Sequence, residues 1–247
     1  MRTILLLIIA ILYLILTSPV LLILWLIRKK HPQAATNTAV RMIRWIFRLL
    51  VAAAGTKIRV IGIERIPTDT ACLYIGNHRS IFDIIITDLY TPGPTGYVAK
   101  TELGKIPLLK NWAILIGCLF FNRHDLKEGM KMILDGIQKL KNGHSIFIFP
   151  EGTRNKQASD LPLLEFHEGS FKMASKSKCP IVPVSISNTI QIWEGHFPWV
   201  RRAKVVVEFG TPIYQEDIPA EARRQVGAYV RNRMQEAMER NQALLKS

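Results

Sequence analysis

The sequence predicts a single α/β domain with a mixed, largely parallel sheet flanked by helices, preceded by an N-terminal two-helix element that binds a membrane. From Lys57 onward, short apolar runs alternate with helical patterns, which is typical of an α/β domain. Several of these runs are uninterrupted, as expected for strands that are covered on both faces. The first 60 residues contain nine Lys and Arg side chains and no acidic one, so much of the formal net charge of +14 lies at one end.

The segment from Thr3 to Ile27 carries no formal charge and consists mostly of Leu and Ile. As one helix it would be about 36 Å long, enough to cross a hydrocarbon layer of about 30 Å. Arg28-Lys29-Lys30 follows it and no small-residue cleavage site does, which favours a membrane anchor over a cleaved signal peptide. If the segment crosses the bilayer, the positive-inside rule places the rest of the chain in the cytoplasm. Pro19 also allows a second arrangement, in which two pieces enter and leave one leaflet.

A second helical segment, over residues 36–54, presents Arg41, Arg44 and Arg48 on one face. This pattern is typical of a helix lying on anionic lipid, although a helix packed on the domain with a solvated basic face has the same pattern. After residue 60 the 24 basic and 19 acidic side chains are close to balance, which argues against a nucleic-acid partner. We therefore expect a membrane anchor over 1–55, on a phospholipid surface, and an α/β domain over 56–247 on the cytoplasmic face.

The apolar and helical patterns give the elements of this domain in order. Seven strands are predicted, over 57–63, 72–76, 96–99, 117–121, 145–149, 181–186 and 204–209. Five helices are predicted, over 80–90, 108–116, 126–141, 169–177 and 220–245.

Other common site types have no counterpart in the sequence. The three cysteines, Cys72, Cys118 and Cys179, lie in apolar runs and are expected to be reduced and buried. There is no closely spaced metal-binding motif, no P-loop and no dinucleotide-binding glycine pattern. We therefore expect neither a metal nor a cofactor.

Polar clusters follow three of the predicted strands. His78 lies at a strand-to-helix turn, with Asp83 in the first helical turn, close enough for the carboxylate to orient the imidazole as a general base. The same segment is also compatible with Asp83 serving only the helix N-terminus. Arg123 ends a second strand, and Glu151, Gly152 and Arg154 follow a third. Two arginines at strand ends suggest an anionic substrate, because a guanidinium matches phosphate oxygens, although each arginine alone could be a surface charge.

Four sequence blocks in order resemble the glycerophospholipid acyltransferases, specifically the 1-acyl-sn-glycerol-3-phosphate acyltransferase family. The blocks are NHRSIFD (77–83), GCLFFNR (117–123), FPEGTRN (149–155) and CPIVPVSI (179–186). The resemblance implies transfer of a fatty acyl group from acyl-CoA or acyl-carrier protein to the sn-2 hydroxyl of lysophosphatidic acid, yielding phosphatidic acid. It also implies an N-terminal helical element that holds the site at the membrane surface.

The resemblance assigns roles to individual residues. His78 would be the general base on the acceptor hydroxyl and Asp83 its orienting partner, with no covalent enzyme intermediate. The residues that would bind the glycerol phosphate are Lys100, Lys105, Arg123, Glu151, Gly152, Thr153 and Arg154. An acyltransferase for another lysophospholipid and a non-catalytic lipid-binding protein are the alternatives, and a binding protein would not need a general base.

The sequence departs from the family pattern at three places. Arg79 stands where glutamine is common. Its positive charge would either favour the neutral imidazole of His78 or contact phosphate. Phe166-His167-Glu168-Gly169 replaces a pattern that usually carries lysine. His167 is interpreted as a solvated loop residue, with a second polar contact as the alternative. Asn155 stands where serine is usual, and we expect little consequence from it.

Overall fold

The computed structural model describes residues 1–122, 125–157 and 159–246, and it contains one seven-stranded sheet. The order of the strands across the sheet is β1-β7-β6-β2-β5-β3-β4. Strands β6, β2, β5, β3 and β4 are parallel, whereas β7 is antiparallel to β6 and parallel to β1. The mixed, largely parallel sheet and all seven predicted strands are confirmed. The strands are β1 (Lys57–Ile61), β2 (Leu73–Gly76), β3 (Thr95–Lys100), β4 (Leu119–Phe121), β5 (Ser145–Ile148), β6 (Ile181–Ser187) and β7 (Lys204–Phe209).

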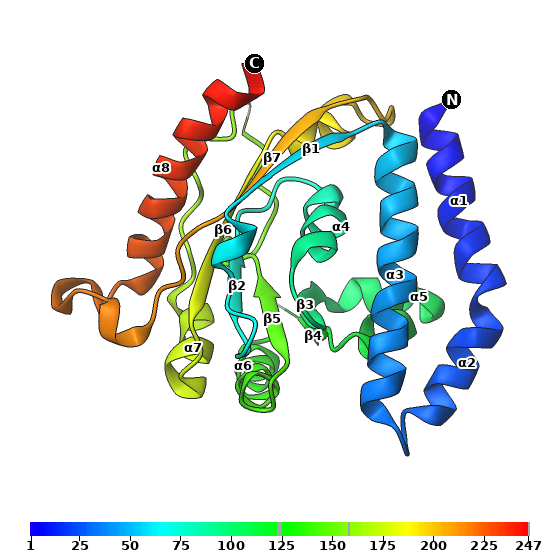
Figure 1. Ribbon diagram of the computed structural model, residues 1–247, viewed down its shortest axis with the longest axis horizontal. Helices are drawn as coiled ribbons and strands as arrows, with labels where there is room; N and C mark the ends of the chain where they lie inside the picture. The colour runs from blue at the N-terminus through cyan, green and yellow to red at the C-terminus, as the bar shows by residue number, and fades with distance from the viewer. Residues whose placement is uncertain (123–124, 158, 247) are drawn as a thin grey trace.

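The helices form a layer on each side of the sheet (Figure 1). The five predicted helices of the domain are present, although two of them begin with a separate 3₁₀ turn, at Glu168–Phe171 and at Ala220–Ala222. The helices are α1 (Arg2–Leu16), α2 (Ser18–Ile27), α3 (Pro32–Ala54), α4 (Ile81–Tyr90), α5 (Pro107–Leu115), α6 (Leu126–Lys141), α7 (Lys172–Ser177) and α8 (Val226–Lys246).

Both faces of the central strands are buried, and successive residues alternate between two apolar cores. In β5, Ile146 and Ile148 face the core under α6, α7 and α8, whereas Phe147 faces the core under α3 and α4. In β2, Leu73 faces the first of these cores and Tyr74 faces the second. Uninterrupted apolar runs are therefore required at the centre of this sheet.

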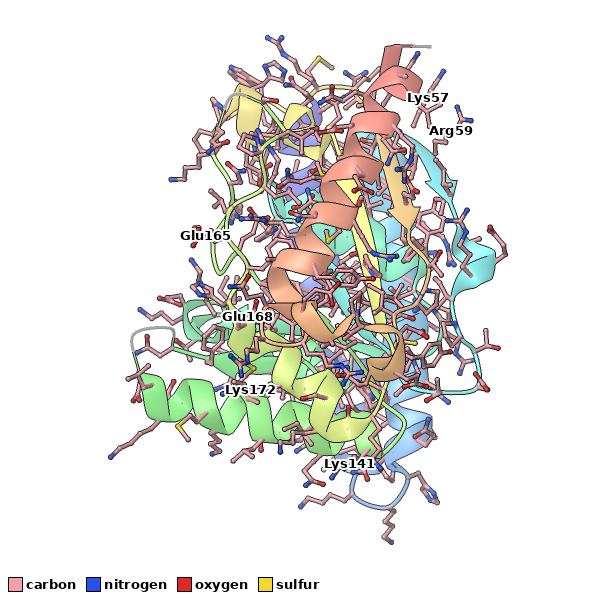
Figure 2. All side chains as sticks on the ribbon, turned by 90° about the vertical axis from the view of Figure 1, so that its left-hand side faces the viewer. Lys57, Arg59, Lys141, Glu165, Glu168 and Lys172 are labelled. Atoms are coloured by element: carbon pink, nitrogen blue, oxygen red, sulfur yellow. The ribbon has the colours of Figure 1, made fainter. Side chains whose placement is uncertain are left out.

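Strand β1, at one edge of the sheet, carries charged side chains. Lys57 and Arg59 project from β1, which has a neighbour on one side only (Figure 2). Charged residues on an edge strand disfavour pairing with another chain. On the face turned to the viewer in Figure 2, Glu165 and Glu168 lie on the long loop after β5, where a Glu168 carboxylate oxygen accepts a hydrogen bond from the Gly227 amide of α8 at 2.8 Å.

The apolar N-terminal segment is a bent pair of helices. Helices α1 and α2 meet at Thr17 with a 48° bend, and Pro19 lies in the first turn of α2. No single helix within the described residues is long and apolar enough to cross a membrane, and only α1 and α2 taken together meet that criterion. Division at Pro19, one of the arrangements that the sequence allows, is what the structure has, because proline removes a backbone donor there. The predicted two-helix N-terminal element is therefore corrected to three helices, α1, α2 and α3.

Helix α3 packs on the domain with one of its three arginines turned inward. Arg41 and Arg48 are exposed, but Arg44 donates to the carbonyl oxygens of Thr91 and Gly93 at 2.6 and 2.9 Å. Its Nε lies 3.6 Å from the buried carboxylate of Asp88 in α4. Burial raises the pKa of Asp88 to about 6, and the Arg44 charge opposes that rise. The prediction that all three arginines face lipid is therefore wrong for Arg44, which joins α3 to α4.

Replacing Arg44 by Met should lower the free energy of unfolding by about 2–4 kcal/mol near neutral pH, because Asp88 would stay buried without its counter-charge. When the pKa of a carboxyl is higher in the folded state than in the unfolded state, the folded protein becomes less stable as the pH rises from the unfolded-state pKa through the folded-state pKa. The difference in the free energy of unfolding between Arg44→Met and wild type should therefore widen as the pH rises through about 6. Thermal unfolding at several pH values, with Arg48→Met as the matched control, measures this. A difference that does not change with pH would contradict the pairing.

Candidate active site

The parallel strands bring polar residues from distant parts of the sequence to one edge of the sheet. His78 follows β2, Glu151 follows β5, and Lys100 ends β3. Because these strands and β6 are parallel, their carboxyl ends share an edge, which is where open α/β sheets bind ligands. Thr189 follows β6 at the same edge. Arg123, which follows β4 in the sequence, lies outside the described residues.

His78 and Asp83 are in direct contact. The Nδ1 atom of His78 lies 2.8 Å from Oδ2 of Asp83, and the Asp83 side chain is fully buried while His78 is partly exposed. The imidazole stacks on the ring of Phe149, with 4.2 Å between the ring centres. These contacts leave the opposite ring edge, with Nε2, in position to accept a proton.

The Asp83 carboxylate binds four donors from two separate segments. Its Oδ2 accepts hydrogen bonds from the backbone amides of Arg79 and Ser80, both at 2.7 Å, in addition to the His78 contact. Its Oδ1 accepts from the hydroxyl of Thr189, a buried residue 106 positions away. Ser80 caps α4 in return by accepting from the Phe82 amide at 3.1 Å. Asp83 therefore serves the helix N-terminus and orients the imidazole at the same time.

Glu151 fixes the turn that carries His78. Its two carboxylate oxygens accept from the backbone amides of His78 at 2.8 Å and Leu164 at 3.2 Å. Burial raises the pKa of Glu151 to about 7, and these amide donors oppose the rise. The Glu151 carboxylate thus joins the β2 turn to the loop after β5, and its contact with substrate stays a prediction.

The Arg79 side chain is buried, and its guanidinium contacts the loop after β5. Its guanidinium donates to the carbonyl oxygens of Gln157, at 2.6 Å, and Ser159, and it lies 3.2 Å from Asp160. Asp160 in turn accepts from the Asn188 amide at 2.8 Å. Arg79 thus ties the His78 turn to that loop and to the end of β6, a role that neither of its two sequence-based interpretations included.

Asn155 has a larger role than the sequence indicated. Its backbone amide donates to the His78 carbonyl at 2.7 Å, and its side chain binds the Gln157 amide and the Pro162 carbonyl. The side chain is buried. Asn155 thus closes the loop that Arg79 also holds, and the small effect expected of asparagine in place of serine stays a prediction.

Arg154 lies on the solvent side of the site. Its Nη1 donates to Glu194 Oε1 at 3.1 Å, and about half of the side chain is exposed. The Glu194 carboxylate also accepts from the Ser80 hydroxyl at 2.5 Å and from the Ile81 amide at 2.8 Å, both at the start of α4. An exposed guanidinium is thus held beside the turn that carries His78.

The remaining predicted substrate-binding residues surround this edge. Gly152 has a φ of +67°, which favours glycine, and a side chain there would approach His167 Nε2 to 3.2 Å. Thr153 is exposed beside Arg154, Lys100 is partly buried at the end of β3, and Lys105 is exposed on the 3₁₀ turn that follows. The roles of these side chains in binding substrate stay predictions.

Two site residues were missed by the sequence analysis. Thr189 lies just past the end of β6, so the rule that ligands bind at strand ends could have identified it. Glu194 lies in a long loop with no recognisable motif, and only the fold shows that it reaches α4.

Several known proteins are similar to this chain. A family model described as acyltransferase matches residues 57–187, which is more than half of the chain. The chain is 30% identical over 193 residues to the 1-acyl-sn-glycerol-3-phosphate acyltransferase of Saccharomyces cerevisiae, covering 77% of this chain and 63% of that protein. It is 35% identical over 148 residues to the enzyme of that name from Borreliella burgdorferi, covering 60% of this chain and 58% of that protein. The matched region thus spans about three fifths of the length of these relatives.

A solved structure has the same fold. It is the 1-acyl-sn-glycerophosphate acyltransferase PlsC from Thermotoga maritima, which has 23% sequence identity and a TM-score of 0.79. The match covers 97% of this chain and 95% of that one, which extends the shared fold to the N-terminal helices. With His78 and Glu151 of two of the motifs placed at the shared strand edge, and the family model matched over residues 57–187, this chain belongs to the acyltransferase family.

Proposed function

We propose that this protein transfers a fatty acyl group from acyl-CoA or acyl-carrier protein to the sn-2 hydroxyl of 1-acyl-sn-glycerol 3-phosphate. The product would be phosphatidic acid, an intermediate for phospholipid biosynthesis. The observation that carries the proposal is the hydrogen bond between His78 Nδ1 and Asp83 Oδ2 at the shared strand edge, in a chain of the acyltransferase family. A purely structural aspartate would not need to hold an imidazole with one ring edge facing the site.

The reaction follows from this geometry. Asp83 accepts a hydrogen bond from the Nδ1–H group of His78, which leaves Nε2 unprotonated and able to act as the base. As the acceptor hydroxyl attacks the thioester carbonyl, Nε2 takes its proton and a tetrahedral intermediate forms. The carbon–sulfur bond then breaks, and the imidazolium returns the proton to the leaving thiolate. The acceptor hydroxyl is the nucleophile, so the enzyme needs no covalent intermediate.

Arg154 is the residue best placed to bind the acceptor phosphate. Its guanidinium is exposed and is held beside the His78 turn by Glu194, so a phosphate can reach it without a large rearrangement. Arginine suits a phosphate because its planar fork can donate two parallel hydrogen bonds. Lys100, at the end of β3, adds positive charge on the same edge of the sheet.

The N-terminal helices support a position on a membrane. On α1, side chains such as Ile4, Leu7 and Ile11 are 49–58% exposed, and Leu22 and Leu26 on α2 are each 61% exposed. Such an apolar surface is unfavourable in water and favourable in a bilayer. Arg28-Lys29-Lys30 at the end of α2 suits the anionic cytoplasmic leaflet, so we place the domain on that face.

Purified protein, supplied with an acyl-CoA and an equimolar mixture of lysophospholipid acceptors, should form phosphatidic acid in preference to other products. His78→Ala should lower the rate roughly 100- to 10,000-fold, because the acceptor hydroxyl loses its base. Mass spectrometry of the products gives both results. Full activity in the variant would refute the role of His78, and preferential acylation of another lysophospholipid would replace the proposed acceptor.

Arg154→Ala should raise the KM for lysophosphatidic acid roughly 10- to 100-fold and change kcat much less, since a charged hydrogen bond to the phosphate is lost. Arg233→Ala on α8 is the matched control, because it removes the same charge elsewhere on the surface. Steady-state kinetics with varied acceptor measures the effect. An unchanged KM in Arg154→Ala would exclude Arg154 from the phosphate site.

A further inference from the structure

The loop between β6 and β7, residues 188–203, reaches from the active site to the outer surface. Near its start, Thr189 binds Asp83, and further along Glu194 binds Arg154 and the first turn of α4. Beyond Glu194 the loop exposes two aromatic side chains, Phe197 at 73% and Trp199 at 56%. One short segment therefore holds catalytic residues at one end and presents aromatic surface at the other.

The exposed aromatic residues are held in place by the loop itself. The Trp193 indole donates to the Pro198 carbonyl at 3.1 Å, and its ring lies 5.9 Å from that of Phe197. The Trp199 amide donates to the His196 carbonyl at 2.8 Å, and the Arg201 amide donates to the Ile192 carbonyl at 2.8 Å. The aromatic tip is thus a structured feature of the loop.

The tip of the loop adjoins the N-terminal end of α1. The Val200 amide, next to Trp199, donates to the hydroxyl of the buried Thr3 at 2.8 Å. In Figure 1 this loop and the start of α1 lie close together at the upper right of the molecule. Ile4, the next residue of α1, is 58% exposed, so the aromatic tip continues the apolar surface of the N-terminal helices.

We propose that residues 197–202 form a second lipid-contacting element, which sets the rim of the active site on the bilayer surface. Trp and Phe suit the interface between headgroups and acyl chains, and the exposed Arg201 and Arg202 suit anionic headgroups. A lipid surface is favoured over a protein partner because the tip is continuous with the apolar face of α1. The inference rests on the proposed function, in which the acceptor itself is a lipid.

Spin labels at three positions of the full-length protein test this directly. Trp199→Cys places a nitroxide on the loop, Ile11→Cys places one on α1, and Leu134→Cys places one on the exposed face of α6, all at positions of similar exposure. Labelled wild type gives the background from Cys72, Cys118 and Cys179. The accessibility of each label to oxygen and to a water-soluble nickel complex is measured by electron paramagnetic resonance, on phosphatidylcholine–phosphatidylglycerol vesicles.

The labels at positions 199 and 11 should be shielded from nickel and accessible to oxygen, whereas the label at 134 should remain in water. If position 199 remains in water while position 11 lies in lipid, the loop proposal is wrong and the helical membrane surface stands. If both labels remain in water, the N-terminal helices do not bind the membrane, and the loop proposal is wrong as well. The acceptor-mixture assay tests the chemistry independently of either result.

A kinetic measurement provides a second test. Phe197→Ser combined with Trp199→Ser should lower activity on vesicle-embedded acceptor by about tenfold, because two interfacial side chains are lost. Activity on a short-chain, water-soluble acceptor should be unchanged. Met130→Ser combined with Leu134→Ser, on α6, is the matched control and should affect neither. Equal losses with both acceptors would mean that the loop acts only through the catalytic residues it holds.

Discussion

The active site depends on one buried carboxylate, that of Asp83. It binds the His78 imidazole, the backbone amides of Arg79 and Ser80, and the Thr189 hydroxyl. Removing a carboxylate from water is costly, and these donors offset the cost while fixing the carboxylate in one orientation. The parallel order of β2 and β6 places Thr189 within reach. The topology of the sheet and the orientation of the general base are thus linked through a single side chain.

Further buried polar contacts secure the turn around His78. Glu151 and Asn155 reach it from the loop after β5, and Arg79 holds that loop in return through Asp160. Burial raises the pKa of both Glu151 and Asp160, because the charged form of a carboxyl is disfavoured away from water. These buried charged groups lower stability, and they lie around His78, where the reaction needs precise geometry. Arg154, by contrast, stays exposed, as a residue that must meet a phosphate from solution should.

The sequence predicted the local elements well and the long-range contacts poorly. Central strands such as β2 and β5 were predicted because their apolar runs are covered on both faces. The contact between His78 and Asp83 was predicted because His78 lies at the strand-to-helix turn and Asp83 follows it in the first turn of the helix. Glu194 and Thr189 reach the site across more than 100 residues of sequence. The rule that ligands bind at strand ends points to Thr189, whereas nothing in the local pattern around Glu194 indicates its contact with α4. The inward position of Arg44 depends on the packing of α3 against α4, which helical periodicity alone does not determine.

The most direct test of the account is the acyl-transfer rate of Asp83→Asn, measured with saturating acyl-CoA and lysophosphatidic acid. The amide has almost the same shape, but its NH₂ group would meet the backbone donors and could not hold the imidazole in the same tautomer. We expect a loss of about 1,000-fold in kcat with a nearly unchanged KM for the acceptor. A variant that folds normally and retains a rate within a few fold of wild type would contradict it.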